Sequence, residues 1–185
     1  PATFADPTTE PYKDILIMPS PLYSGAAAYN LGVITRTEGM GWEYYEALKA
    51  NGITVDKGNG AVQNAIVAGD KGCGLLADYM AIRSKNDGAP VEFVYPAEGS
   101  PAVTEPIGIV NTTDTPELAE AFVDFVLSEE GQTLTSEIGY TPVKSGVAVP
   151  EGLKGIDEIE LMTWDTEELY QNRDADKDQF TQLFQ

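Results

Sequence analysis

The sequence predicts an α/β fold in which a mostly parallel sheet carries helices on both faces. Short apolar runs that suit buried strands alternate with longer stretches whose apolar residues recur at helical spacing. Glycine, proline and asparagine separate the two kinds of segment at frequent intervals. Strands joined through helices of this length run parallel, because each crossover connection returns the chain to the same end of the sheet.

The expected strands are short and rich in apolar or alternating residues, and Pro19 closes the first of them. The third run, which begins at Cys73, is a short apolar run and therefore predicts a buried strand. The strands are expected at residues 14–18, 53–55, 73–77, 91–95 and 107–110.

The expected helices begin at recognisable capping residues. Ser24 precedes an alanine-rich stretch, and Thr115 precedes Pro116, which suits the first helical position. Residues 129–131 are expected to interrupt the long helix that follows Thr115. The helices are expected at residues 26–34, 42–50, 58–69, 78–85, 115–128, 132–138 and 167–184.

The charge of the chain excludes several classes of partner. Thirty Asp and Glu against 11 Lys and Arg give a formal charge of -19, and the basic residues are scattered singly. A protein that binds nucleic acid clusters its basic residues, so nucleic acid is not an expected partner. The same charge disfavours anionic membrane surfaces, and no apolar run approaches the ~20 residues that span a bilayer. Direct membrane insertion is therefore not expected.

Missing residue types narrow the chemistry further. The chain has no His and a single Cys, Cys73. Without His there is no Ser-His or Cys-His pair to activate a nucleophile, and the commonest zinc ligand is missing. Cys73 lies in an apolar run and is expected to be a small buried hydrophobic residue. An enzyme is therefore not predicted, and no cofactor is implied.

The first candidate site is a junction between a predicted strand and a predicted helix. Ser24 caps the helix, and Tyr23, Gly25 and Ala26 flank it. A helix N-terminus carries about half a positive charge, and Gly25 allows close approach to its free N–H groups. A phosphate, carboxylate or carbonate suits such a junction. An ordinary helix cap explains the same residues, and the sequence leaves both interpretations open.

Two further junctions follow later strands and should open at the same edge of a parallel sheet. Asn59 begins one of them and is either a turn residue or an amide donor to the same ligand. Asp78 and Tyr79 begin the other. They offer a carboxylate for an amine or hydroxyl and a phenol for an anion or a ferric ion. The alternative is an N-cap Asp78 followed by a half-buried Tyr79.

Helical spacing places Leu118, Phe122 and Phe125 on one face of the helix that follows Thr115. An apolar stripe of this kind needs a partner, which indicates that this chain is a fragment. The N-terminus at Pro1 has neither an initiator Met nor the basic and apolar regions of a leader. We therefore expect either a removed leader or a piece of a longer chain.

Several segments of the chain carry a family resemblance. The segment at residues 115–132, which contains SEEGQ at residues 128–132, is the most specific. It is accompanied by residues 4–19, 24–25, 41–48, 65–70, 94–99, 164–165 and 172–174. Together they resemble the type II periplasmic binding proteins, particularly those that carry ferric ion or 2-aminoethylphosphonate. The resemblance covers nearly the whole chain.

This resemblance implies a protein of two lobes that close over a ligand by a hinge. Residues 1–105 would form the second, ligand-binding lobe, and residues 106–143 would be the returning part of the first lobe. Residues 144–185 would be a C-terminal extension that packs on the second lobe. Most of the first lobe is expected to be missing from this chain.

The resemblance also implies a function: an extracytoplasmic component of an ABC importer that delivers a small anionic or zwitterionic solute to a membrane permease. The location would be the periplasm or, for a lipoprotein, the outer surface of the membrane. Ferric-ion carriers place two consecutive tyrosines where this chain has Tyr79 and Met80. A phosphonate or sugar phosphate is therefore preferred, with Asp78 suited to an ammonium group or sugar hydroxyls. A ferric-ion carrier that uses Tyr79, and a ligand-sensing receptor domain, remain alternatives.

Overall fold

The computed structural model describes residues 1–103 and 105–185. The chain divides into two compact units, which we call unit 1 and unit 2. Unit 1 comprises Pro1–Val103 and Glu160–Gln185, and unit 2 comprises Thr104–Ile159.

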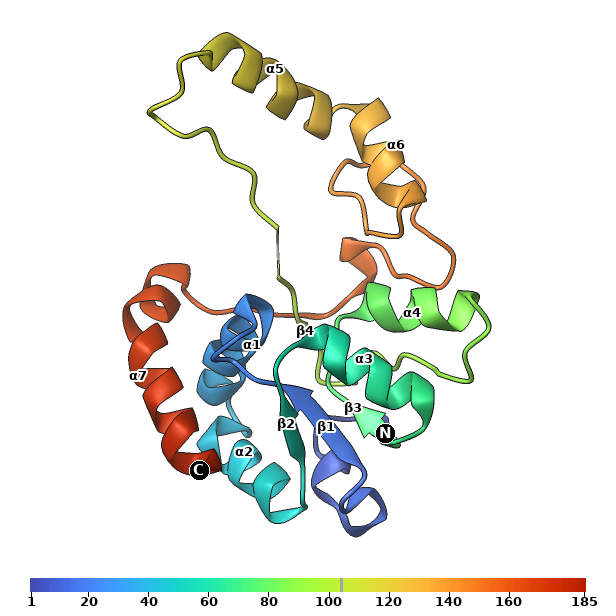
Figure 1. Ribbon diagram of the computed structural model, residues 1–185, viewed down its shortest axis with the longest axis vertical. Helices are drawn as coiled ribbons and strands as arrows, with labels where there is room; N and C mark the ends of the chain where they lie inside the picture. Colours follow the sequence, from blue (N-terminus) through green and yellow to red (C-terminus); the bar gives the residue numbers. More distant parts are fainter. Residues whose placement is uncertain (104) are drawn as a thin grey trace. The chain divides into compact units, whose positions relative to one another are not determined.

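Unit 1 is built on a parallel sheet of three strands in the order β2-β1-β3 (Figure 1). The central strand β1 (Leu16–Pro19) is buried along its whole length. Ile17 pairs with Thr54 of β2 (Thr54–Asp56), and Leu16 pairs with Cys73 of β3 (Cys73–Gly74). The predicted fold class is confirmed.

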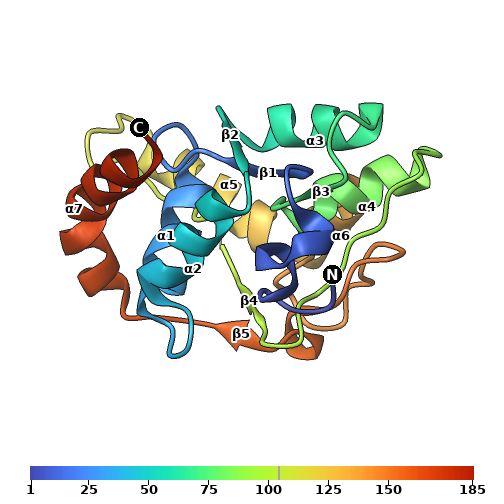
Figure 2. The same ribbon diagram turned by 90° about the horizontal axis from the view of Figure 1, so that it is seen from below.

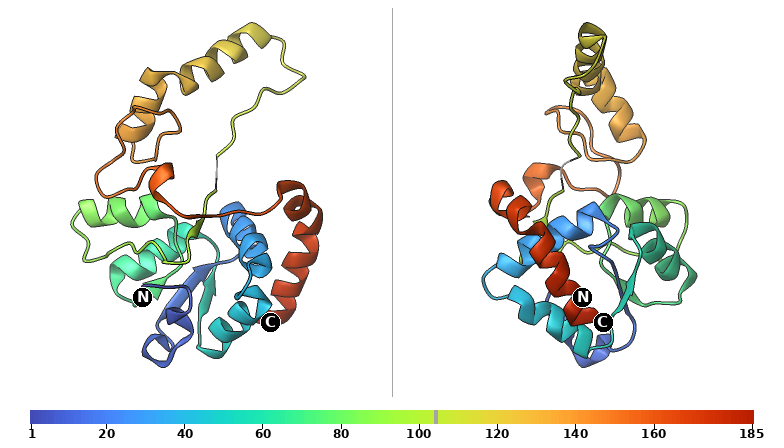
Figure 3. Two further views of the ribbon diagram at one scale, coloured as in Figure 1. Left: turned by 180° about the vertical axis from the view of Figure 1, so that it is seen from behind. Right: turned by 60° about the vertical axis from the view of Figure 1, so that its left-hand side comes forward.

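Helices cover both faces of this sheet, as Figures 1, 2 and 3 show from different sides. On one side lie α1 (Gly25–Arg36), α2 (Gly41–Ala50) and α7 (Thr166–Phe184). On the other side lie α3 (Asn59–Ala68) and α4 (Asp78–Asn86). Two 3-10 helices, η1 (Asp6–Thr8) and η2 (Glu10–Tyr12), precede β1.

The core of unit 1 joins residues that are far apart in the sequence. Leu31 and Val33 of α1 pack with Leu48 of α2 and Met18 of β1, and Phe180 of α7 belongs to the same cluster. A second, two-stranded parallel sheet pairs β4 (Ser100–Pro101) with β5 (Leu161–Met162), which leads into α7. The last 26 residues therefore form part of the same core as the first hundred.

Unit 2 contains α5 (Pro116–Leu127), α6 (Glu129–Glu137) and the 3-10 helix η3 (Ile156–Glu158). The side chain of Ser128 caps α6 by accepting a hydrogen bond from the Gly131 N–H at 3.1 Å. The helix is interrupted as predicted, but the predicted position of the break, residues 129–131, is wrong. The break lies at Ser128, and Glu129 to Gly131 form the first turn of α6.

Two expected strands are wrong. Residues 91–95 and 107–110, all within the described part of the chain, form no strand. Apolar alternation is a local signal, but a strand also needs a neighbour with which it exchanges backbone hydrogen bonds. The third expected strand, 73–77, is reduced to Cys73–Gly74 and is only partly buried.

The boundary of unit 2 differs from the expected division of the chain. Residues 144–159 cluster with α6 rather than with the C-terminal helix. The Ser136 hydroxyl donates to the Ala148 carbonyl at 2.6 Å, and the Thr141 hydroxyl donates to the Lys154 carbonyl at 3.4 Å. These bonds tie the segment to unit 2. No described helix is both long enough and apolar enough to cross a membrane.

Candidate functional site

Three strand-to-helix junctions meet at one edge of the unit 1 sheet. The strands β1, β2 and β3 are parallel, so their carboxyl ends lie at the same edge, and the chain continues from them into α1, α3 and α4. In open parallel sheets this edge is where ligands bind. The predicted site residues Tyr23, Ser24, Gly25, Ala26, Asn59, Asp78 and Tyr79 all belong to these junctions.

The loop before α1 is organised by Ser20, which the sequence analysis did not single out. Its N–H donates to the Asp56 carbonyl at the end of β2 at 2.7 Å. Its carbonyl accepts from the N–H groups of Tyr23 and Ser24 at 3.2 and 3.0 Å. The buried Ser20 thereby fixes the path of the chain into the helix. Its position between two prolines indicated only a turn.

Ser24 is the N-cap of α1, as predicted. Its hydroxyl oxygen accepts from the Ala27 N–H at 3.2 Å. Among the described residues, no hydrogen bond takes up the N–H groups of Gly25 and Ala26. A Cβ atom placed on Gly25 would have no other atom within 4 Å. The first turn of α1 therefore presents two backbone donors beside open space.

The second junction has a different cap. Gly58 is the N-cap of α3, and Asn59 is the first helical residue. No hydrogen bond of the Asn59 side chain is found among the described residues. The amide is partly buried at the edge of the sheet. An amide in this position can either donate to or accept from a neighbouring group.

Helices α3 and α4 are fixed to each other by one side chain. The Gln63 amide nitrogen of α3 donates to the Met80 carbonyl at 3.2 Å and to the Ser84 hydroxyl at 2.8 Å. Ser84 is buried, and its hydroxyl in turn donates to the Met80 carbonyl at 3.0 Å. The second and third junctions are thus held at a fixed spacing.

Asp78 does not cap α4 in the predicted way. The N-cap is Ala77, and Asp78 is the first helical residue. The Asp78 Oδ1 accepts from the Tyr79 N–H at 2.8 Å, and Oδ2 accepts from the Tyr95 hydroxyl at 3.0 Å. A carboxylate in the first turn is also favoured by the helix dipole. The contact with Tyr95 was not predicted, because residues 91–95 were expected to pair as a strand.

Tyr79 has a cationic neighbour. The guanidinium carbon of Arg83, one turn further along α4, lies 5.7 Å from the centre of the Tyr79 ring. Such contacts stabilise a cation over an aromatic face. The phenol of Tyr79 is thus placed beside a positive charge at the start of α4.

Cys73 lies beneath this edge rather than on it. Its side chain packs against the core, and burial raises the pKa of its thiol. A thiol with a raised pKa is mostly protonated at neutral pH and is a poor nucleophile. The described residues contain no group of three or more His, Cys, Asp or Glu that is arranged to hold a metal ion.

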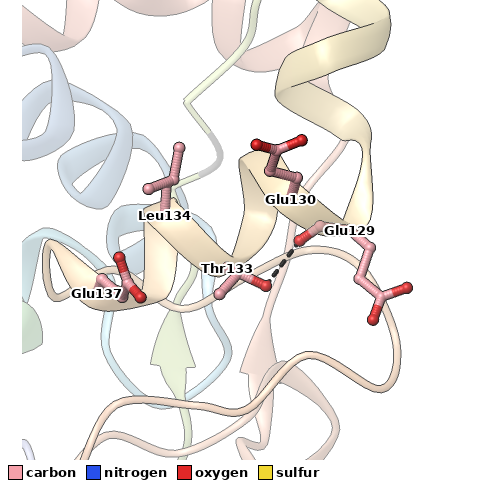
Figure 4. A pocket seen from close by; sticks show the side chains of 5 residues that line it. All are labelled: Glu129, Glu130, Thr133, Leu134 and Glu137. Carbon is pink, nitrogen blue, oxygen red and sulfur yellow. Dashed lines mark hydrogen bonds between the residues drawn. The ribbon is translucent and has the colours of Figure 1, made fainter.

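The hollows of unit 2 do not form a competing site. One is lined by Glu129, Glu130, Thr133, Leu134 and Glu137, all from α6. Figure 4 shows Glu130 and Leu134 pointing to one side of the helix and Glu129 to another. The second is lined by residues of α5 and its cap, including Leu118 and Phe122. Each hollow is lined by a single helix with its cap and lies open at the surface.

A family model provides the decisive comparison. Residues 11–159 match the family described as bacterial extracellular solute-binding protein. The chain belongs to this family. The predicted relationship is therefore confirmed, and it covers the three junctions, α5 and α6. No curated protein matches the sequence significantly.

Several solved structures share the fold of this chain. The periplasmic binding protein AfuA from Actinobacillus pleuropneumoniae, with exogenous fructose-6-phosphate bound, has a TM-score of 0.84 and 21% identity over 98% of this chain and 59% of its own. Iron-bound HitA from Pseudomonas aeruginosa has a TM-score of 0.76 and 19% identity over 97% of this chain and 61% of its own. An ABC transporter structure from Clostridium perfringens has a TM-score of 0.78 and 18% identity over 100% and 63%. This chain therefore spans about three fifths of the length of these proteins.

Proposed function

We propose that the natural protein containing this chain is the solute-binding component of an ABC importer. It captures a small anionic or zwitterionic solute outside the cytoplasm, in the periplasm or anchored at the membrane surface as a lipoprotein, and delivers it to the membrane permease. It is a carrier and not an enzyme. Family membership supports the general function. The observation that carries the solute class is the first turn of α1, where the N–H groups of Gly25 and Ala26 face open space.

Local charge favours an anion at this turn although the chain as a whole is strongly negative. The helix N-terminus provides about half a positive charge and two aligned donors. The formal charge of -19 is spread over the chain. Beyond about 8 Å at physiological salt, repulsion from these exposed carboxylates is largely screened. The adjacent N–H groups therefore determine whether an anion binds.

Within this class we favour a phosphonate or a sugar phosphate. AfuA, whose fold this chain shares, was solved with fructose-6-phosphate. A phosphoryl group has three oxygens that can accept from the α1 turn, while Asp78 is suited to an ammonium group or to hydroxyls on the other end of the solute. Asn59 lies at the same edge of the sheet and has an amide suited to either group.

Ferric ion is the second candidate, because HitA, which shares the fold, was solved with iron bound. Tyr79 would be the ligand from this unit. Ferric iron prefers several anionic oxygens, and the residue after Tyr79 is Met80 rather than a second tyrosine. This departure lowers the expected affinity for iron relative to a phosphoryl solute.

We further propose that unit 1 corresponds to the ligand-binding lobe and unit 2 to part of the other lobe. The order of the junctions along the chain and the family match over residues 11–159 support this proposal.

Calorimetry on the natural full-length protein tests the proposal. It should be titrated separately with 2-aminoethylphosphonate, fructose-6-phosphate and ferric ion. We expect saturable binding of at least one phosphorus compound and weaker binding of iron. Tight iron binding with a tyrosinate charge-transfer band, together with no heat from either phosphorus compound, would establish the iron carrier instead.

A further inference from the structure

We infer that Tyr95 positions Asp78 and determines specificity in the proposed solute site. Together the two side chains form a pair that can only accept hydrogen bonds, which we call the Asp78–Tyr95 pair. The pair selects a solute that carries an ammonium group. This inference rests on the proposed function and deepens it, because it names the solute as a zwitterion rather than a simple anion.

The hydrogen bond between Tyr95 and Asp78 joins residues that are distant in the sequence and orients the Asp78 carboxylate. Tyr95 is 17 residues from Asp78, and its hydroxyl donates to Asp78 Oδ2 at 3.0 Å. The other carboxylate oxygen is held by the Tyr79 N–H at 2.8 Å. Both carboxylate oxygens are therefore oriented, and both residues are only partly buried. A carboxylate fixed by two donors loses less conformational freedom when it binds a ligand.

The hydrogen-bond donors and acceptors of the Asp78–Tyr95 pair determine which ligand groups it can bind. A tyrosine hydroxyl can donate one hydrogen bond, and the Tyr95 hydroxyl donates it to Asp78. The lone pairs of the phenol oxygen, like those of the ionised carboxylate, can only accept. A phosphate or phosphonate group is anionic at neutral pH, so the negatively charged Asp78 repels it and the group gains nothing from such a pair. An ammonium group, with three donors and a positive charge, is matched to it.

Neighbouring contacts keep Tyr95 in place. Its ring packs edge-on against Phe93, with centroids 4.8 Å apart and planes at 75°. Glu92, which directly precedes Phe93, forms an ion pair with Lys85 at the far end of α4, at 2.6 Å. Segment 91–95 thus contacts α4 at both ends of the helix.

The pair complements the first turn of α1, which belongs to the same sheet edge. That turn offers only donors, and the Asp78–Tyr95 pair offers only acceptors. A solute that satisfies both must carry an anionic group and an ammonium group. A phosphate or phosphonate without an amine would satisfy the α1 turn alone.

The test uses the full-length natural protein with Tyr95→Phe, Asp78→Asn and the double variant. Tyr95→Phe removes the hydroxyl but keeps the ring that packs on Phe93. The probes are 2-aminoethylphosphonate and ethylphosphonate, which differ by the amine, and binding is measured by calorimetry. Tyr170→Phe is the matched control, because this tyrosine is 68% exposed on α7.

We expect Tyr95→Phe to lower the affinity for 2-aminoethylphosphonate about tenfold, as for loss of one hydrogen bond to a charged group. The affinity for ethylphosphonate should change by less than about twofold. In the Asp78→Asn background, the effect of Tyr95→Phe should shrink to less than about threefold, because the acceptor charge is already lost. Tyr170→Phe should match the wild type with both probes.

Two results would overturn the inference, and they are distinguishable. In the first, the wild type binds 2-aminoethylphosphonate, but Tyr95→Phe lowers the affinity for both probes equally or for neither. Tyr95 then has no role in specificity, and the proposed function stands. If wild type binds neither probe, the zwitterionic solute and the role of Tyr95 are both rejected. Binding of fructose-6-phosphate in that case would still support a carrier of phosphorylated solutes.

Discussion

Ser20 and Gly25 show how two small residues shape the candidate site. Ser20 joins the ends of β1 and β2 and directs the next four residues into α1. Gly25 then leaves the first N–H groups of the helix accessible. The sequence predicted the cap at Ser24 and the open turn, because capping depends on local residue types. It did not predict Ser20 or Tyr95, because their roles depend on partners 36 and 17 residues away.

Substitution of Gly25 by Ala, Val and Phe should weaken binding of 2-aminoethylphosphonate progressively. A larger side chain covers the N–H groups that face the solute, and loss of one to two bonds to a charged group corresponds to roughly tenfold to a thousandfold for Phe. The free energy of unfolding should change by less than about 1 kcal/mol, since an added Cβ contacts no other atom within 4 Å.

Calorimetry of the series, with urea unfolding as the control for the fold, checks this expectation. Equal affinity across Ala, Val and Phe would remove the α1 turn from the site.

Tyr44 and Tyr45 predict how stability responds to alkaline pH. Burial raises the pKa of both phenols above the ordinary value of 10.0. The folded protein therefore keeps protons that the unfolded chain loses. Their contribution is fully present below about pH 10 and is lost as the pH rises further, at up to about 1.4 kcal/mol per pH unit for each group.

Urea unfolding between pH 8 and pH 11 measures this loss. Tyr44→Phe should make the decline shallower by removing one of the two groups. It should also stabilise the protein by about 1 kcal/mol at pH 7, because the buried Tyr44 hydroxyl has no hydrogen-bond partner among the described residues. An unchanged pH profile in this variant would show that Tyr44 does not contribute.

Helix positions followed from the sequence better than strand positions did. All seven expected helices are present, because capping residues and apolar spacing are local signals. Two of the five expected strands are missing, since pairing depends on distant partners. The attachment of α7 is also long-range. Arg36 of α1 binds Asp176 of α7 through two hydrogen bonds, at 2.8 and 3.2 Å.

Asp176→Ala should lower the free energy of unfolding by about 3 kcal/mol. The Arg36 and Asp176 side chains are only 15% and 12% exposed, so the variant leaves a largely buried guanidinium without its main partner. Arg173→Ala is the control, because Arg173 and Asp174 are 56% and 94% exposed and 4.0 Å apart. It should cost less than about 0.5 kcal/mol.

Urea unfolding of both variants provides the comparison. If Asp176→Ala and Arg173→Ala lower the free energy of unfolding equally, the contact between Arg36 and Asp176 does not hold α7 on α1. Faster proteolysis within α7 in Asp176→Ala alone would support the assigned role.

The two units differ in how completely they bury their apolar residues. Unit 1 has a continuous core that includes its last helix. In unit 2, α5 has no buried residue, and Leu118, Phe122 and Phe125 are 69%, 60% and 41% exposed. The helical spacing predicted this apolar stripe, and the structure leaves it uncovered. The proteins of known structure that share this fold are longer, and this chain spans 59% to 63% of their length.

The 185-residue chain should therefore bind an apolar dye through α5. Nile red is preferable to an anionic dye because the chain carries a formal charge of -19. The variant with Leu118, Phe122 and Phe125 all changed to Ser should lose most of the dye fluorescence, since a contiguous apolar patch is what such dyes bind. Val67→Ser is the control, because Val67 is 41% exposed and belongs to α3 of unit 1 rather than to α5.

Unit 1 should be unaffected by the triple change, and the chain offers a selective probe of this. Its only two tryptophans, Trp42 and Trp164, both belong to unit 1. Their fluorescence during urea unfolding reports on unit 1, and the transition should move by less than about 0.5 kcal/mol, as for surface substitutions. Retained dye binding in the triple variant would show that the exposed surface lies elsewhere. A large shift of the tryptophan transition would show that α5 contributes to the stability of unit 1.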